Sequence, residues 1–208
     1  MKKLARAALI TGIVILFNGC LSALHPLFTE KDIVFDPRLV GIWRVGDKDT
    51  AIFQKGSTET FRELPEELQH LAGKAYLLTI KDAEEELKYY AFLSRIGKEL
   101  YLDYYPAETL RQHQYDGFYK QHLTRLHSFY KVQFNNSESF KISQFDEKYL
   151  RDLINNKQIR IRHEVRFDGS YVITAPTEEL QQYVLKYGST PEAYIKEDID
   201  TYIRITNH

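Results

Sequence analysis

The chain has 208 residues, with 28 Lys and Arg against 29 Asp and Glu, and a formal net charge of −1. This balance excludes the strongly basic proteins that bind nucleic acid through a charged surface, so no nucleic-acid partner is expected. The sequence contains a single cysteine, which excludes a disulfide within the chain.

The first twenty residues have the pattern of an export signal. Three basic residues within the first six positions precede an apolar run over residues 7–17, and Gly19 stands directly before Cys20. A membrane-spanning helix needs about 20 apolar residues, so this run is too short to span a bilayer. The pattern therefore favours a secretory signal that ends at the cysteine.

The apolar run followed by Gly19-Cys20 resembles the signal peptide and lipobox of bacterial lipoproteins. The resemblance implies cleavage before Cys20, acylation of this residue, and attachment of the chain to membrane lipid in the cell envelope. Leu21, which follows the cysteine, implies the outer membrane rather than the inner one. The alternative is a secreted protein with an unmodified thiol.

Three segments are predicted along the chain: a signal peptide over residues 1–19, the lipidated Cys20 with a polar tether over residues 20–36, and one β-rich globular domain over residues 37–208. Because the predicted domain contains no cysteine, thiol catalysis and thiolate metal sites are excluded within it.

The middle of the chain contains several segments with strand composition. Strands are predicted over residues 74–80, 86–96, 99–105, 122–134, 139–145 and 171–175, with a last strand over residues 198–205. Tight turns are predicted at Gly97-Lys98, at residues 135–137 and at Asp168-Gly169, because glycine and asparagine tolerate the positive φ angles that hairpins need.

Residues 159–167 show the clearest alternation of apolar and charged residues. One face is predicted to contain Ile159, Ile161, Val165 and Phe167, and the other Arg160, Arg162, Glu164 and Arg166. A strand with one buried and one solvated face has this pattern.

Short helices are predicted mainly in the C-terminal half. Residues 146–156 begin with Asp146, which can cap the helix. Residues 176–188 have an apolar stripe up to Tyr187, and Gly188 is expected to end this helix. A third helix is predicted after Thr190, and a weaker one over residues 65–73. The expected fold is mainly β (α+β): an antiparallel, barrel-like or strongly curled sheet of about eight or nine strands with two or three short C-terminal helices.

The triplet Gly41-Ile42-Trp43 resembles the Gly-x-Trp motif that opens the lipocalin and calycin barrels. The resemblance implies that Trp43 closes one end of a barrel and that Arg204, in the last strand, lies across it. The alternative is an ordinary core tryptophan and a solvated arginine. The order of segments is also similar to that of uncharacterised bacterial lipoproteins, which implies no activity.

The histidines do not predict a metal site. His113 lies in a predicted loop without a second ligand nearby, His122 and His127 are expected on opposite faces of one strand, and His163 lies on the apolar phase of its segment. The common nucleotide-binding, serine hydrolase and metalloprotease motifs do not occur. No catalytic residue, metal, other cofactor or enzymatic activity is therefore predicted.

The chain contains 15 Tyr and 12 Phe. Tyr101, Tyr130 and His163 are candidates for lining a cavity, because tyrosine walls can hold an apolar ligand and orient it through their hydroxyls. The alternative is that these aromatic residues are strand formers of a filled core.

Three functions are compatible with these observations. The first is a membrane-anchored lipoprotein with a non-enzymatic β-domain that binds a protein or another envelope component. The second is a lipocalin-like carrier of a small apolar ligand, and the third is a hydrolase whose site is assembled only in space. A filled barrel favours the first, and a cavity of several hundred Å³ favours the second.

Overall fold

The computed structural model describes residues 21–46, 49–64, 66–81, 86–107 and 124–206. The expected signal peptide, Cys20, His113 and His122 lie outside these residues. In the described part of the chain, no helix is long and apolar enough to cross a membrane.

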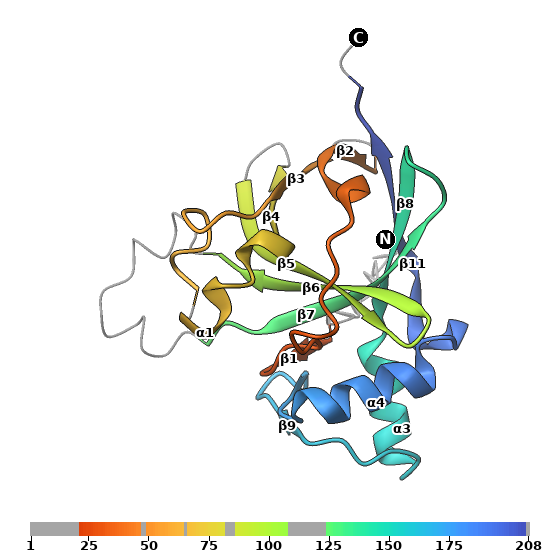
Figure 1. The fold of residues 1–208 in the computed structure, drawn as a ribbon. Helices are drawn as coiled ribbons and strands as arrows, with labels where there is room; N and C mark the ends of the chain where they lie inside the picture. The colour runs from red at the N-terminus through yellow and green to blue at the C-terminus, as the bar shows by residue number, and fades with distance from the viewer. Residues whose placement is uncertain (1–20, 47–48, 65, 82–85, 108–123, 207–208) are drawn as a thin grey trace, which may run out of the picture.

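The main feature of the fold is a closed antiparallel barrel (Figure 1). Its eight strands, in chain order, are β2 (Gly41–Val45), β3 (Asp49–Lys55), β4 (Tyr76–Lys81), β5 (Glu86–Ile96), β6 (Glu99–Pro106), β7 (His127–Phe134), β8 (Ser139–Phe145) and β11 (Tyr194–Arg204). The last strand, β11, pairs with the first, β2, so that Arg204 lies opposite Trp43. Closure leaves no barrel edge unpaired, and the expected fold class is confirmed.

Tight hairpins connect most of the barrel strands. The β5–β6 turn contains only Gly97 and Lys98, and Gly97 has a φ of 62°. The β7–β8 turn lies between Phe134 and Phe140, as the asparagine-rich segment predicted. These local turns set the register of neighbouring strands and therefore make the meander predictable.

Helices fill the long connection between β8 and β11. Asp146 caps α3 (Glu147–Asn155) through the Lys148 amide, as predicted. The expected stripe of α4 (Thr177–Tyr187) is buried, and both helices lie beside the barrel (Figure 1). The third expected helix is one 3₁₀ turn, Pro191–Ala193, and the Thr190 side chain does not cap it. The weaker N-terminal helix is α1 (Glu66–Gln69), followed by a 3₁₀ turn at Ala72–Lys74.

The predicted strand over residues 159–167 is wrong in its extent. Strand β9 covers only His163–Val165 and pairs with β10 (Tyr171–Ile173). Ile161 is buried in the core cluster beside α3 and α4, and Ile159 packs against it, as the alternation predicted. The sheet ends at β9, however, so the second half of the apolar face has no core to cover it: Val165 is 56% exposed and Phe167 is fully exposed. The turn between β9 and β10 is also longer than predicted, since Arg166 bonds to Ser170 around three intervening residues.

The expected tether over residues 20–36 is wrong for its described part. Leu21, Leu27 and Phe28 are buried, and β1 (Ser22–Ala23) lies between β7 and β10. Its apolar residues have no single periodicity that predicts a packed segment, because Leu21 and Leu27 pack in the cluster beside α3 and α4 whereas Phe28 packs in the cluster under α1. The folded unit therefore includes residues 21–36 and does not start only at residue 37.

Three clusters of buried residues form the core. One fills the barrel and includes Trp43, Phe53 and Phe140. A second lies between the barrel, the N-terminal segment and helices α3 and α4. The third lies under α1 and includes Phe61 and Phe92. The barrel interior is thus largely occupied by side chains, which limits the size of any ligand it can hold.

Candidate functional site

One end of the barrel is closed by Trp43 and Arg204. The Trp43 ring is fully buried, and its indole N–H donates to the Leu39 carbonyl at 2.8 Å. The Arg204 Cζ atom lies 4.2 Å from the centroid of this ring. Leu39 belongs to the 3₁₀ turn Pro37–Leu39, which directly precedes β2 and so covers the same end.

The Arg204 guanidinium also donates hydrogen bonds to three backbone carbonyls from separate parts of the chain. Nη1 donates to Val40 at 3.0 Å, Nη2 to Arg38 at 2.6 Å and Nε to Ser137 at 3.1 Å. A planar group with donors in several directions can do this while it stacks on an indole ring, whereas an ammonium group cannot. Arg204 thereby connects the first strand, the last strand and the β7–β8 turn.

The last strand faces the barrel interior with its even-numbered residues. Ile203 and Ile205 are about 40% exposed, whereas Tyr202 is buried inside the barrel. Arg204 therefore shares the inner phase with Tyr202, and the isoleucines face outward. The barrel end can accommodate the guanidinium because its charge is met by carbonyl oxygens and by the indole face.

Replacing Arg204 by Lys is expected to lower the free energy of unfolding by about 1 kcal/mol, the usual range for a cation–π contact. The charge is kept, but the stacked plane and part of the hydrogen-bond fork are lost. Chemical denaturation followed by the emission of Trp43 measures the effect, and the emission maximum should shift as well. An unchanged midpoint with unchanged emission would contradict a role in closure.

The opposite end of the barrel opens into a cavity of about 370 Å³. Its wall is formed by Ile80, Tyr89, Tyr104, Ser128, Tyr130, Ile142, Gln144, Asp200 and Tyr202. The Tyr104 and Tyr130 rings lie 4.9 Å apart, and Tyr89 lies 5.8 Å from Tyr104. We call this space the mouth cavity. It has aromatic and aliphatic walls with polar groups among them, as is usual for small-molecule sites.

The Tyr104 hydroxyl is the most unusual polar group of the mouth cavity. It is fully buried and makes no hydrogen bond of good geometry with any described residue, although the Tyr202 hydroxyl lies near enough for a weak interaction with it. Burial raises its pKa well above the ordinary value, and the nearby Tyr202, Tyr130 and Asp200 raise it further. The hydroxyl is therefore neutral at physiological pH and can donate a hydrogen bond to a ligand.

The three residues predicted to line a cavity are not brought together. Tyr130 does line the mouth cavity. Tyr101 lies on the outer face of the barrel and packs against Phe145, within the cluster shared with α3 and α4. Neighbouring strand residues point to opposite sides, and the barrel interior takes the even-numbered residues of β6, such as Leu102 and Tyr104.

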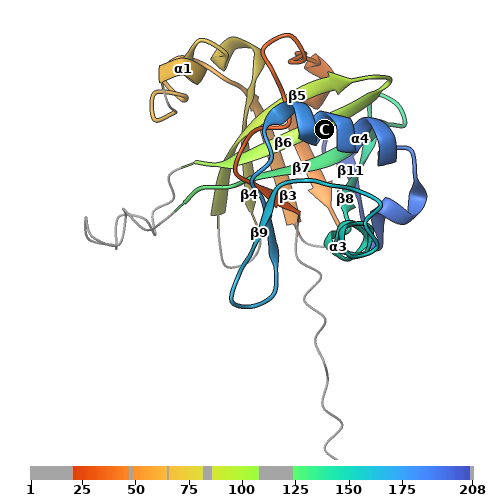
Figure 2. The same ribbon diagram turned by 90° about the horizontal axis from the view of Figure 1, so that it is seen from below.

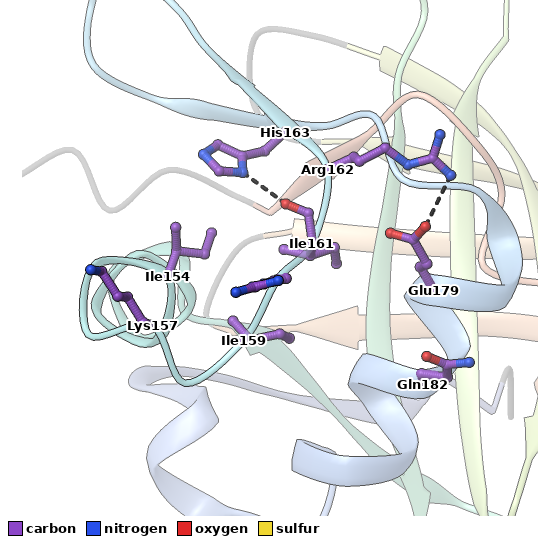
Figure 3. Close-up of a pocket in the computed structure, with 9 residues that line it drawn as sticks. Ile154, Lys157, Ile159, Ile161, Arg162, His163, Glu179 and Gln182 are labelled. Carbon is purple, nitrogen blue, oxygen red and sulfur yellow. Dashed lines mark hydrogen bonds and ion pairs between the residues drawn. The ribbon is translucent and has the colours of Figure 1, made fainter.

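His163 lies outside the barrel, in a groove of about 870 Å³ between the end of α3, residues 159–163 and α4. Its Nδ1 atom lies 2.9 Å from the Ile161 carbonyl, and its ring stacks on Tyr171. Arg162 pairs with Glu179 across the groove (Figure 3). The prediction that His163 lines the same cavity as Tyr130 is therefore wrong.

A buried His–Asp pair was not identified from the sequence. His127 Nδ1 lies 2.6 Å from Asp103 Oδ1, and both side chains are almost completely buried. The other carboxylate oxygen accepts the Leu27 amide at 2.8 Å, and the Tyr105 ring covers the imidazole. The one signal in the sequence is Asp103 itself, a charged residue among the leucines and tyrosines of β6. Its position indicates that it holds the N-terminal segment against the barrel.

Among the described residues, no cluster of three or more His, Cys, Asp or Glu side chains is arranged to hold a metal ion. A scan against protein-family models, a search of curated proteins and a search of solved structures give no match for this chain. The site must therefore be interpreted from its own geometry.

Proposed function

We propose that the chain is a lipid-anchored, non-enzymatic barrel of the cell envelope, in the outer membrane rather than the inner one, that binds a small amphipathic ligand in its mouth cavity. The observation that carries this proposal is the mouth cavity with the Tyr104 hydroxyl in its wall, which has no well-placed hydrogen-bond acceptor among the described residues. A buried hydroxyl without a good partner costs up to about 1–3 kcal/mol, and a ligand that accepts a hydrogen bond from it would recover part of this energy.

The shape of the cavity restricts the ligand. A volume of about 370 Å³ is near the lower end of the usual range for small-molecule sites. Below the mouth cavity, Phe53, Phe140 and Tyr202 pack against one another. A compact ligand with an apolar or ring-shaped body and a carbonyl or other acceptor group fits these walls, whereas a long acyl chain does not.

The Tyr104→Phe substitution is expected to weaken binding of the neutral probe prodan about 5- to 10-fold, the loss of one hydrogen bond of about 1–1.5 kcal/mol. Prodan has two fused rings and a carbonyl acceptor, and its emission reports the polarity of its site. A fluorescence titration of protein in detergent-free solution measures the affinity. The variant should be at least as stable as the original, because an unsatisfied hydroxyl is removed.

Tyr183→Phe is the matched control for this titration. The Tyr183 hydroxyl is also buried without a hydrogen-bond partner, but it lies outside the barrel among the residues under α4. This substitution should leave prodan affinity unchanged. Equal affinities for both variants and the original would contradict ligand binding at Tyr104.

The lipid anchor is supported by the basic start, the short apolar run and Gly19-Cys20. Cys20→Ala is expected to release the protein from the membrane fraction, because stable anchoring needs two or more acyl chains. Mass spectrometry of the mature N-terminus identifies the modification directly. Leu24→Ser, which alters an exposed residue nearby, should leave the protein in the membrane fraction. A mature chain with an unmodified Cys20 would contradict the anchor.

Binding of an envelope protein has one supporting observation, the groove between α3 and α4. Its walls combine the apolar Ile154, Ile159 and Ile161 with the basic Lys157 and Arg160, a composition suited to a segment with acidic and apolar residues. A protein partner and a small ligand have very different masses, so the measurement that closes the Discussion separates these two functions.

A further inference from the structure

We infer that the β9–β10 hairpin inserts its tip into the bilayer surface at which Cys20 is anchored, so that the barrel is held in one fixed orientation on the membrane. This inference rests on the lipidation of Cys20 proposed above. Two independent features of the domain lead to it: the path of the chain after Cys20, and the composition of the hairpin.

The register of β1 places the start of the described chain on the same side as the hairpin tip. Strands β1 and β10 run parallel, with Ser22 beside Val172 and Ala23 beside Ile173. Leu21, the residue before Ser22, therefore lies on the same side as the residues before Val172, which form the hairpin turn. Cys20 is bonded to Leu21, and consecutive Cα atoms are about 3.8 Å apart.

No spacer separates the anchor from the folded domain. Leu21 is only 1% exposed, and strand pairing begins at the next residue, Ser22. A diacylglycerol on Cys20 would therefore hold the domain directly against the headgroups. Whichever face lies around Leu21 must contact the membrane, and the β9–β10 hairpin belongs to that face.

The hairpin has the composition of a membrane-contacting element. It projects from the rest of the domain (Figure 2), and Phe167 at its turn is fully exposed. Val165, the last residue of β9, is 56% exposed. Phe167 lies two residues beyond Val165, so the tip extends about 7 Å past the last strand pair. A phenylalanine at such a tip finds no protein surface to cover it, but it suits the headgroup–acyl boundary.

One basic residue, Arg166, lies directly beside Phe167, and the acidic Glu164 and Asp168 flank the two; all of them are exposed. The Arg166 guanidinium can bind a lipid phosphate beside the inserted ring. Because the apolar tip lies on the side of the domain at which the acylated Cys20 would hold it, the occupant that fits this tip is a phospholipid bilayer.

The test uses the full chain, purified with its native modification and reconstituted into vesicles of phosphatidylethanolamine and phosphatidylglycerol. Part of the lipid has a nitroxide on its acyl chains. Lipidation would consume the thiol of Cys20, so Phe167→Cys would introduce the one thiol that a bimane fluorophore can label. Leu185→Cys is the control, because Leu185 is another exposed apolar residue, 60% exposed, near the C-terminal end of α4 and beside Gly97 of the β5–β6 turn.

Quenching of the label at position 167 is expected to exceed quenching at position 185 at least about threefold, since interfacial residues lie about 5–10 Å deep in the headgroup–acyl boundary. Equal quenching in protein that floats with the vesicles would overturn the hairpin contact while leaving the anchor intact. Failure of both variants to float, with bimane attached to Cys20, would overturn the anchor and the inference that rests on it.

Discussion

Replacing Asp103 by Ala is expected to lower the free energy of unfolding by about 2–5 kcal/mol, because two buried groups each lose a hydrogen-bond acceptor at about 1–3 kcal/mol apiece. The carboxylate is completely buried and is the acceptor for both His127 and the Leu27 amide. Without it, two buried groups lose their partner at the same time. Denaturation followed by the emission of Trp43 measures the loss.

The loss should also be localised to the N-terminal segment. Limited proteolysis of the Asp103→Ala protein is expected to cut near Leu24 and His25, which are exposed in this segment, before it cuts within the barrel. Asp152→Ala, on the exposed side of α3, should change stability by no more than about 0.5 kcal/mol. A similar small change for Asp103→Ala would contradict the role of the His127–Asp103 pair.

The second large effect is expected for Gly41→Ala, which should destabilise the domain by about 2–3 kcal/mol, within the range for a residue held in a rarely populated backbone conformation. Gly41 has a φ of 146°, which residues with a side chain rarely adopt. A Cβ atom at this position would also collide with Nη1 of Arg204. The substitution therefore strains the backbone and displaces the guanidinium from the Val40 carbonyl.

Gly73→Ala is the matched control, since a Cβ atom at Gly73 would meet no other atom within 4 Å. Its stability should be unchanged or slightly higher. In the double variant Gly41→Ala with Arg204→Lys, the two losses should not add, because both act on the same contact. Strict additivity would show that the close approach of Arg204 to Gly41 contributes nothing.

The barrel could be predicted because its signals are local. Gly97-Lys98 and the asparagines at positions 135 and 136 each specify a turn between strands adjacent in the chain. Asp146 and the stripe ending at Tyr187 specify two helices by the same kind of short-range rule. The Gly-x-Trp triplet then indicated which strand opens the barrel, and the structure places Arg204 over Trp43.

The remaining features depend on contacts between residues far apart in the chain. Asp103 and His127 are 24 positions apart, and Asp103 and Leu27 are 76 apart. Their meeting follows from barrel register and from the path of residues 21–36, which no periodicity reveals. The same limit explains Tyr101: alternation places it opposite Leu102, but only the closed barrel shows which of the two faces inward.

Native mass spectrometry of the protein, extracted gently from the membranes of its host, tests the proposed function most directly. We predict the mass of a chain that begins at an acylated Cys20 and retains one small molecule, which is lost from the Tyr104→Phe variant and kept by Tyr183→Phe. A chain that carries no small molecule, or one that retains a protein partner instead, would contradict ligand binding in the mouth cavity.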